Sequence, residues 1–319
     1  MNNKTIPVFF TIDDSFAPYV SVAIHSLIEN CSQDRTYDIY IIYQDVTTEN
    51  QKKIQSLATE YAHIHFEEMG PQIEQITNRK ENYLRCDYFT ATIFFRLFLA
   101  EMFPQYDKGI YLDSDVVVPG DISKLYDTPL SQEEIIGACT DMSVQDIPEL
   151  MEYFDHCVGA GGTTYFNSGV LLLNLKLMRE KHLRDEFLKL LNTYHFDTVA
   201  PDQDYLNAMC HGRVHYLDHS WDVMPGDKTF WGKTPNLIHY NLFDKPWQRE
   251  NVPYKEYFWK YVNGSGFEEK IKADAAAYTD EQRKADDESM AYLVSRSVEI
   301  MQEEKTFQNI YKKGIKVRI

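Results

Sequence analysis

The stretch at residues 108–120, KGIYLDSDVVVPG, places two carboxylates two positions apart in an otherwise apolar run. The β-branched and aromatic residues on both sides predict a strand that continues past the acids. Because side chains alternate along a strand, we expect Asp113 and Asp115 on one face and Ser114 on the other. Ionised carboxylates among apolar neighbours need a partner, and Mn²⁺ or Mg²⁺ would supply it. The alternative is a strand that ends at Leu112, followed by a solvated turn.

The size and charge of the chain limit its class. Its 319 residues can bury a full core, as one large domain or as a domain with an appendage. The net charge of −17 argues against nucleic acid as the partner, since that affinity comes largely from Lys and Arg on phosphates. Any phosphate group must therefore be bound locally, by a metal ion, a few basic side chains or backbone amides.

The cysteines and the N-terminal segment bear on the compartment. Five cysteines without C-x-x-C spacing predict neither a disulfide framework nor a zinc site, and they fit a reducing compartment. The opening MNNKTIPVFFTIDDS has too short an apolar stretch for a signal peptide, and no run approaches membrane-spanning length. We therefore expect a cytoplasmic protein.

Strand and helix patterns alternate over residues 6–70. The expected elements are strands at 6–12, 37–43 and 64–66 and helices at 19–29 and 48–61. This alternation predicts an α/β fold with a mainly parallel sheet, in which ligands bind beyond the carboxyl ends of the strands. Asp13 and Asp14 follow the first strand, so they are expected on the same rim as Asp113 and Asp115. Helix capping is the alternative role for Asp13 and Asp14.

Arg96 and His239 each have two interpretations, whereas Lys245 has one. Arg96 falls in a predicted amphipathic helix at residues 92–103, where it either reaches solvent or pairs with an acid or a phosphate. His239 ends a predicted strand and is either a structural histidine or a ligand in an oxygen-rich metal site. Lys245, considered alone, would be solvated.

The composition changes to a charged helical segment after about residue 265. Apolar residues at helical spacing predict packing on the main body; they are Met290, Leu293, Val294, Val298 and Met301. Residues 305–319 carry basic side chains and no acid, which predicts a disordered tail, with weak peripheral contact at the inner membrane face as the alternative. We divide the chain into a main domain at residues 1–264 and a C-terminal helical extension with a basic tail at residues 265–319.

Six motifs follow one another over residues 6–250. They are the opening strand with Asp13 and Asp14, then FFRLFLAE, YLDSDVVV, FNSGVLLLNL, PDQDYLN and HYNLFDKPW. In this order they resemble glycosyltransferase family 8, the retaining enzymes that include bacterial lipopolysaccharide galactosyl- and glucosyltransferases and glycogenin. The resemblance implies a GT-A fold, which is a Rossmann-like nucleotide-sugar domain. It implies a metal-dependent enzyme that transfers glucose or galactose from a UDP-sugar to a glycan, lipid-linked or protein acceptor through an α-linkage.

The same resemblance implies roles for individual residues. Asp113, Asp115 and His239 would bind Mn²⁺ or Mg²⁺ together with the diphosphate of the donor. Further residues would contact the donor: Thr11 and Asp13 at the uracil, Asp14, Arg96 and Ser114 around the nucleotide sugar, and Lys245 at the diphosphate. Asn167, Asp202 and Gln203 would line the sugar as the catalytic group. Because a neutral amide such as that of Gln203 is a poor nucleophile, same-face attack by the acceptor is favoured over a covalent intermediate.

The chain departs from the family pattern at two motifs. Ser15 and Phe16 stand where Asn-Tyr often follows the first acids, and Leu242 replaces the glycine of HYxGxxKPW. That leucine lies where the backbone should approach a phosphate. Acceptor-binding segments vary in the family, and we place them by position at residues 86–90, 141–162 and 228–233.

Two other functions remain open. A sugar nucleotidyltransferase also needs acidic metal ligands, but it usually has a glycine-rich, basic loop after the first strand, and here that loop is acidic. A nucleotide-sugar binding module without turnover is the non-catalytic alternative. The complete set of Asp113, Asp115, His239 and Lys245 argues against such a module, whereas Leu242 argues for it.

Overall fold

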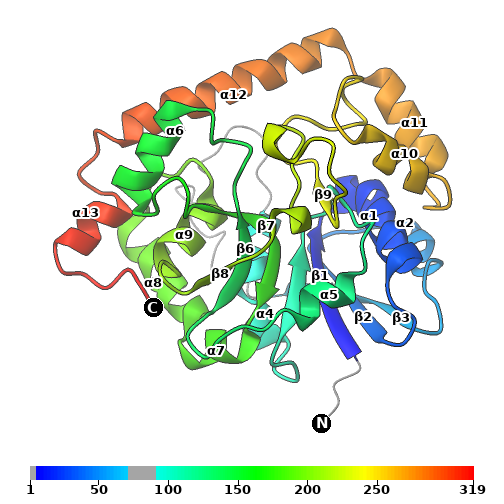
Figure 1. Ribbon diagram of the computed structural model, residues 1–319, viewed down its shortest axis with the longest axis horizontal. Helices are drawn as coiled ribbons and strands as arrows, with labels where there is room; N and C mark the ends of the chain where they lie inside the picture. Colours follow the sequence, from blue (N-terminus) through cyan, green and yellow to red (C-terminus); the bar gives the residue numbers. More distant parts are fainter. Residues whose placement is uncertain (1–4, 71–90) are drawn as a thin grey trace.

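A seven-stranded sheet forms the centre of the computed structural model, which describes residues 5–70 and 91–319. The strand order is β3-β2-β1-β4-β7-β6-β8. The strands are β1 (Thr5–Ile12), β2 (Thr36–Tyr43), β3 (Ala62–Glu68), β4 (Gly109–Leu112), β6 (Ile136–Thr140), β7 (Phe166–Leu173) and β8 (Val214–Tyr216). Among these strands β7 alone runs antiparallel to its neighbours. The predicted α/β fold with a mainly parallel sheet is confirmed (Figure 1).

Helices pack on both faces of this sheet, because the side chains of the buried strands alternate between two apolar clusters. In β1, Val8 and Phe10 belong to one cluster and Phe9 to the other. The first cluster is covered by α1 (Ala17–Asn30), α2 (Thr48–Gln55), α5 (Ile122–Asp127), α10 (Lys255–Val262) and α11 (Glu268–Ala277). The second is covered by α4 (Leu99–Met102), α6 (Pro148–Tyr153), α7 (Leu175–Glu180), α8 (Leu183–Tyr194) and α9 (Pro201–Met209).

Two predicted helices differ from the observed ones. The helix expected at residues 48–61 ends at Gln55, and the chain turns into β3. The helix expected at residues 92–103 is a 3₁₀ segment, Ala91–Leu97, followed by the short α4. Within the 3₁₀ segment Arg96 donates a 3.1 Å hydrogen bond from Nε to the Ile93 carbonyl, so this side chain turns inward instead of lying along a regular helix.

The strand predicted to continue past the two acids is wrong. β4 ends at Leu112, and the chain turns out of the main sheet before β5 (Val116–Val117) pairs with β9 (Ile238–His239) in a separate two-stranded sheet. The alternative is confirmed in part: the strand does end at Leu112, but the turn is not fully solvated, because the Asp115 side chain is only 14% exposed. Within this turn Ser114 is buried, whereas Asp113 and Asp115 are partly exposed.

The C-terminal helices lie against the main body. In Figure 1, α12 (Asp280–Ile300) runs across the top of the molecule from α10 and α11 to α6 and α13 (Phe307–Lys312). Leu293 and Ile300 are buried in the second cluster, as helical packing requires, whereas Val298 is 41% exposed, contrary to prediction. The domain boundary after residue 264 remains a prediction.

The basic tail is ordered, contrary to the expected disorder. Val317 is buried in the second cluster. The backbone amide of Ile319 donates to the Met209 carbonyl at 3.0 Å, and Lys316 forms a 2.8 Å ion pair with Glu186. Apolar contacts therefore hold a segment whose charge suggested disorder. In residues 5–70 and 91–319 we find no helix that is long and apolar enough to cross a bilayer.

Four cysteines are buried as free thiols, which agrees with the expectation of no disulfide framework in the described part of the chain; they are Cys31, Cys139, Cys157 and Cys210. Burial raises the pKa of Cys157 to about 12 and that of Cys31 to about 11. Both thiols are thus kept protonated and unreactive. Cys86 and the acceptor-binding segment predicted at residues 86–90 lie outside the described residues.

Candidate active site

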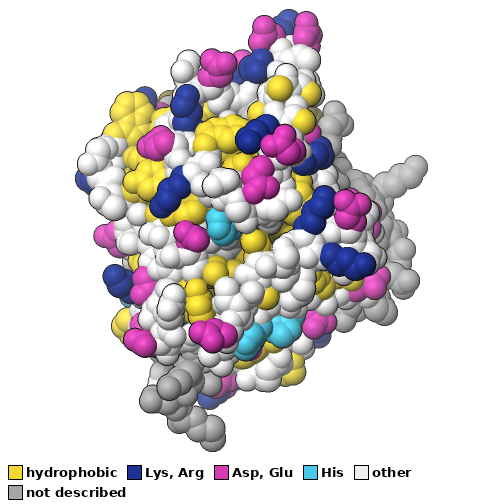
Figure 2. Space-filling view, turned by 90° about the vertical axis from the view of Figure 1, so that its right-hand side faces the viewer, with side chains coloured by type: hydrophobic (Ala, Val, Ile, Leu, Met, Phe, Trp, Pro, Cys, Tyr) yellow, Lys and Arg dark blue, Asp and Glu magenta, His cyan; other side chains and the backbone are white. Residues whose placement is uncertain are grey.

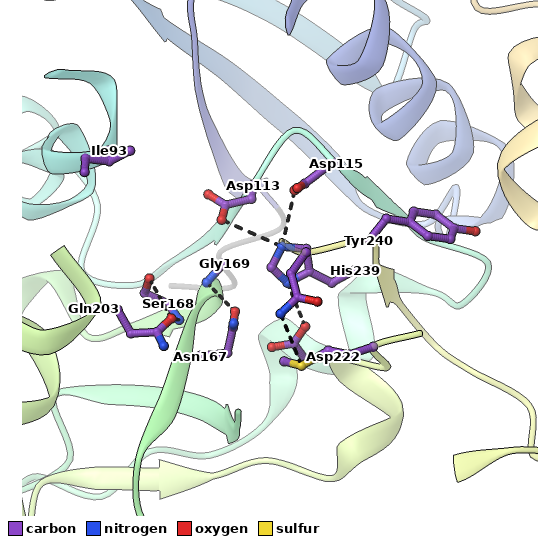
Figure 3. Close-up of polar contacts among 12 residues, drawn as sticks. Ile93, Asp113, Asp115, Asn167, Ser168, Gly169, Gln203, Asp222, His239 and Tyr240 are labelled. Carbon is purple, nitrogen blue, oxygen red and sulfur yellow. Dashed lines mark hydrogen bonds and ion pairs between the residues drawn. The ribbon is translucent and has the colours of Figure 1, made fainter. Parts of the chain in front are cut away.

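Pairing of β5 with β9 brings together the three predicted metal ligands. Val116 lies opposite His239 in this pair, and the Tyr240 amide donates to the Asp115 carbonyl at 2.9 Å. The imidazole Nε2 of His239 consequently lies 3.2 Å from Asp115 Oδ1 and 3.8 Å from Asp113 Oδ2 (Figure 3). Residues more than 120 positions apart in the sequence thus converge on one point, as the prediction required.

The ligand atoms of this cluster suit a hard divalent ion. One oxygen each from Asp113 and Asp115 and one nitrogen from His239 lie within 4.8 Å of one another. Asp115 Oδ1 is fully buried and receives no well-directed hydrogen bond from the described residues. Its charged neighbour is the His239 imidazole, whose Nε2 lies 3.2 Å away, and a divalent ion held by both groups would take over that neutralising role. The donor set of carboxylates and an imidazole is one that Mn²⁺ accepts.

Asp222 holds the other side of the imidazole. Its Oδ1 lies 3.1 Å from His239 Nδ1, and its side chain is completely buried. Burial raises the pKa of Asp222 to about 6. Burial would lower the pKa of His239, but Asp115 and Asp222 outweigh it and raise that pKa to about 10. This histidine therefore carries a proton that a metal ion must displace.

Lys245 reaches into the same cluster and is not solvated. Its ammonium group donates to Asp115 Oδ2 and to the Tyr240 carbonyl. Burial raises the pKa of Asp115, but Lys245 and His239 lower it by more, so the carboxylate stays ionised. Lys245 thus places a positive charge beside Asp115 and the predicted diphosphate position.

Arg96 pairs with acids, which decides between its two interpretations. Its side chain is 5% exposed; Nη2 donates to Asp113 Oδ1 at 2.9 Å, and Nε lies 3.2 Å from Asp202 Oδ2. Tyr111 lies under the guanidinium and donates to the same Asp113 oxygen at 2.7 Å. Both donors fix Asp113 through Oδ1, which leaves Oδ2 directed at His239. Any contact of Arg96 with the donor remains a prediction.

Gly169 of β7 is required by the close approach of the ligands. A Cβ atom at this position would lie 2.2 Å from His239 Cε1 and 2.7 Å from Asp113 Oδ2. The Gly169 carbonyl also accepts the Asp113 amide at 2.7 Å. Only glycine leaves room for the imidazole and the carboxylate to meet over the strand (Figure 3).

The three predicted sugar-lining residues lie together on β7 and α9. Gln203 Oε1 accepts the Ser168 amide at 2.9 Å, and Asp202 Oδ2 accepts the Ser168 hydroxyl at 3.0 Å. Asp141 Oδ2 accepts from both Gln203 Nε2, at 2.9 Å, and Asn167 Nδ2, at 3.1 Å. Asp141 thereby fixes both amides, and it marks the start of the predicted acceptor segment at residues 141–162.

The four other residues predicted to contact the donor, Thr11, Asp13, Asp14 and Ser114, have different structural roles. Thr11 Oγ1 lies 2.9 Å from the Tyr111 hydroxyl and so joins the network of Asp113. Asp13 caps the 3₁₀ turn Asp14–Phe16 by accepting the Ser15 amide, which is the capping alternative. Asp14 accepts the Thr47 amide at 2.7 Å and so fixes the start of α2. Ser114 is buried in the turn between the two acids. Contacts of these four residues with a nucleotide remain predictions.

Two adjoining cavities lie beside these residues. One, of about 210 Å³, is lined by the three predicted metal ligands and by the residues predicted to line the sugar. The other, of about 890 Å³, lies between the segment that follows β1, at residues 14–19, the 242–248 loop and helices α11 and α12. Ile93, Asp202, Leu242 and Leu293 line both cavities, so the two are neighbours. Leu242 has a φ of +52°, the left-handed conformation that favours glycine.

Sequence reasoning missed three residues of the site, Asp222, Gly169 and Tyr111, and it placed Asp141 only as the start of a variable acceptor segment. Asp222 and Asp141 stand in loops without a motif, and only long-range contacts reveal their roles. Gly169 had a signal, because a glycine inside an apolar strand indicates a close approach of other groups. Tyr111 was interpreted only as a strand residue.

Comparisons with known proteins identify the family to which this chain is similar. A family model described as glycosyl transferase family 8 matches residues 7–251. The chain is 26% identical to glycosyltransferase GlyB of Streptococcus pneumoniae serotype 4, over 82% of this chain and 62% of GlyB. It is 25% identical to the lipopolysaccharide 1,2-glucosyltransferase of Escherichia coli strain K12, over 86% of this chain and 82% of that protein. The chain thus spans less than two thirds of the length of GlyB.

A solved structure matches the fold over most of the chain. The galactosyltransferase LgtC, in complex with donor and acceptor sugar analogs, superposes with a TM-score of 0.71 at 26% identity. The match covers 81% of this chain and 96% of LgtC. The predicted GT-A type of fold is confirmed by this likeness and by the mixed α/β sheet.

Proposed function

The chain belongs to glycosyltransferase family 8, and from this premise we propose that it transfers a hexose from a UDP-sugar to an acceptor hydroxyl in a reaction that depends on Mn²⁺ or Mg²⁺. The observation that supports this most is the convergence of Asp113, Asp115 and His239 around a buried carboxylate oxygen without a well-directed donor. Glucose and galactose are the proposed sugars, since relatives are named for each.

The two cavities suggest how the donor divides. The 890 Å³ cavity reaches Asp14, Ser15 and Lys245 and is large enough for a nucleoside. The 210 Å³ cavity contains Gln203 and Asn167 beside the metal ligands and suits the hexose. The diphosphate would then cross the point where the cavities meet, close to Lys245 and the two acids.

We propose that the transfer proceeds by departure and attack on one face of the sugar. The bond from C1 to the β-phosphate oxygen breaks, and its electron pair stays on the departing UDP. A bound divalent ion supplies charge stabilisation to that leaving group. Lys245 can turn from Asp115 to the diphosphate and add a second positive charge. The acceptor oxygen forms the new bond to C1, and its proton passes to the departing phosphate oxygen.

The environment of Gln203 argues against a covalent intermediate. Its side-chain oxygen already accepts the Ser168 amide, and its nitrogen is held by Asp141. An amide in that state is a weak nucleophile but a fixed dipole. The carboxylates of Asp141 and Asp202 line the same cavity as Gln203, and they can stabilise positive charge that develops on the sugar carbon. Retention of configuration, with an α-linked product, is the expected outcome.

The acceptor remains defined by class. We propose a glycan, glycolipid or glycoprotein hydroxyl that approaches between residues 141–162 and 228–233. In the second segment the Trp231 side chain is 54% exposed, and aromatic faces are common contacts for sugars. We also propose a cytoplasmic location, with weak contact between the basic tail and the inner face of the membrane. A lipid-linked acceptor would be bound to that face.

The two alternatives have less support. A sugar nucleotidyltransferase would need a basic phosphate loop after β1, where this chain has Asp13 and Asp14. A binding module without turnover would not need the ligand cluster and Lys245 together. Leu242 was the argument for that module, yet its backbone adopts the glycine-like conformation.

One experiment separates these functions. The purified protein is incubated with Mn²⁺ and a panel of UDP-sugars, and free UDP is measured with and without a chelator. Release of UDP from UDP-glucose or UDP-galactose that stops with the chelator supports the proposal. Pyrophosphate-dependent formation of UTP would instead indicate a nucleotidyltransferase. Binding without UDP release, even when acceptor glycans are added, would indicate the module.

A further inference from the structure

A second set of metal-binding side chains lies on the first edge of the sheet, away from the proposed active site. Parallel pairing sets Asp38 of β2 opposite His63 of β3, and Tyr40 opposite His65. Residues two apart in a strand share a face, so all four side chains project from the same side of the two strands. β3 is the edge strand of the sheet formed by the described residues.

Both imidazoles converge on one carboxylate oxygen. His63 Nδ1 lies 3.2 Å from Asp38 Oδ1, and His65 Nε2 lies 3.3 Å from the same atom. In a tetrahedral ion with bonds of 2.0–2.1 Å, neighbouring ligand atoms are about 3.3 Å apart. All three ligand atoms lie within 4.8 Å of one another. Two of the three separations therefore match those around one small ion, and the third lies within 4.8 Å.

Neighbouring aromatic side chains orient Asp38 and His65. The Tyr106 hydroxyl donates to the other oxygen, Asp38 Oδ2, at 2.8 Å and lies 2.9 Å from the Tyr40 hydroxyl. The Tyr40 ring stacks on His65 with centroids 4.8 Å apart. Metal sites typically have such outer contacts, which orient the ligating groups. An accidental cluster of exposed histidines would not need them.

The site is open to solvent. The side chains of His63 and His65 are 48% and 41% exposed, and that of Asp38 is 19% exposed. Figure 2 views the molecule from the β3 side, and two histidine side chains are exposed next to one another in its lower part. An ion can enter without a change in the fold, and water can occupy its fourth position.

We propose that Asp38, His63 and His65 form a second metal site, which we call the edge-strand site, for a borderline divalent ion of the Zn²⁺ class. Two imidazoles and one carboxylate suit Zn²⁺ better than the hard ions expected at the active site. The ion would link the edge strand β3 to its neighbour β2. Its ligands lie in the amino-terminal halves of these strands, whereas the proposed active site lies beyond the carboxyl ends. Its role is structural, and it takes no part in sugar transfer.

Titration of the chelator-treated protein with Zn²⁺, in competition with a chromophoric chelator, tests this proposal. The wild type should bind one Zn²⁺ more than His63→Gln or His65→Gln, and Zn²⁺ should raise its unfolding temperature by more than it raises theirs. Tyr106→Phe should keep the site but weaken it about tenfold. The exposed His182→Gln is the matched control and should behave as wild type.

Equal Zn²⁺ stoichiometry in the wild type and in both histidine variants would overturn the proposal, as would an equal loss in His182→Gln. Asp38→Asn provides a second route if a histidine variant folds poorly, because it keeps both imidazoles and removes the shared anion. Mn²⁺-dependent UDP release should be the same in all these variants, since none of the changed residues lines the active site.

Discussion

His239 Nδ1 lies 3.1 Å from Asp222 Oδ1, and this contact sets the direction in which the imidazole presents Nε2 to Asp113 and Asp115. Asp222 Oδ2 is buried without a hydrogen-bond partner among the described residues, so the protein tolerates a buried, half-satisfied carboxylate behind the histidine. A carboxylate in this position fixes the ring and makes the ligand more basic.

Asp222→Asn should lower the affinity for Mn²⁺ about tenfold, and Asp222→Ala about a hundredfold. The amide oxygen can still accept from Nδ1, so the asparagine variant loses charge but keeps geometry. Its free energy of unfolding should not fall, because burial already disfavours the charged form of Asp222. Calorimetric titration with Mn²⁺ and chemical denaturation check both. Unchanged affinity in the alanine variant would contradict the role assigned to Asp222.

Asp115→Asn should abolish metal-dependent UDP release, with a loss of about a hundredfold or more in kcat/KM. The variant replaces one carboxylate oxygen by an amide nitrogen and removes the negative charge beside His239, while Lys245 keeps its hydrogen bond to the Tyr240 carbonyl, so the fold should persist. Asp107→Asn, at an exposed acid on the surface, is the control and should keep full activity. Activity in Asp115→Asn that equals wild type and resists chelator would refute the metal-dependent mechanism.

The candidate ligands Asp113, Asp115 and His239 could be named from the sequence, but the way the fold brings them together could not. Asp113 and Asp115 were expected to share a face of one strand, yet β4 ends at Leu112 and the turn leaves the sheet. What places the acids beside His239 is the pairing of two-residue strands. Such short strands have almost no periodic signal, and their partners are more than 110 residues apart. Local pattern therefore identified residue types, and long-range pairing determined their geometry.

The prediction for the basic tail at residues 305–319 was wrong for a different reason. Its basic residues suggested disorder, but Phe307, Ile310 and Val317 each bury an apolar side chain in the body of the protein. Net charge is a property of a whole segment, whereas packing depends on a few apolar positions with a complementary surface. That surface, formed by residues such as Phe196 and Tyr205, is not visible in the sequence of the tail itself.

Gly169→Ala should destroy the metal site, because the added methyl group would overlap His239 Cε1 and Asp113 Oδ2. We expect at least a hundredfold loss of Mn²⁺ affinity and a lower free energy of unfolding, since overpacking of this kind typically costs about 1–3 kcal/mol. Gly161→Ala is the control: the nearest atom to its new Cβ, Asp155 Oδ1, would be 3.8 Å away. Metal titration and thermal unfolding compare the two. Normal Mn²⁺ binding by Gly169→Ala would show that the ligand positions are misassigned.

Binding of Mn²⁺ should release a proton. Without metal the pKa of His239 is raised to about 10, so the imidazole is protonated at neutral pH, and that proton stabilises the metal-free fold below pH 6.5 and ceases to do so as pH rises through 10. A metal needs the neutral ring, so its apparent affinity should rise about tenfold per pH unit between pH 7 and pH 9. Calorimetry in buffers of different ionisation enthalpy measures the released protons. Affinity that is independent of pH would contradict this assignment.

Leu242 should be more easily replaced by glycine than by alanine. Its φ of +52° is a left-handed conformation that costs an L-residue about 1–2 kcal/mol, and alanine retains that cost while glycine does not. Both substitutions remove the same packing of the leucine side chain, so their difference isolates the backbone term. The free energy of unfolding of Leu242→Gly should therefore exceed that of Leu242→Ala by about 1 kcal/mol before the unfolded state is considered. The greater entropy of glycine in the unfolded chain reduces this difference. Denaturant unfolding of the two variants measures this difference. An alanine variant as stable as wild type and more stable than the glycine variant would show that the loop relaxes out of the left-handed conformation, and that the glycine of the family pattern has no backbone counterpart here.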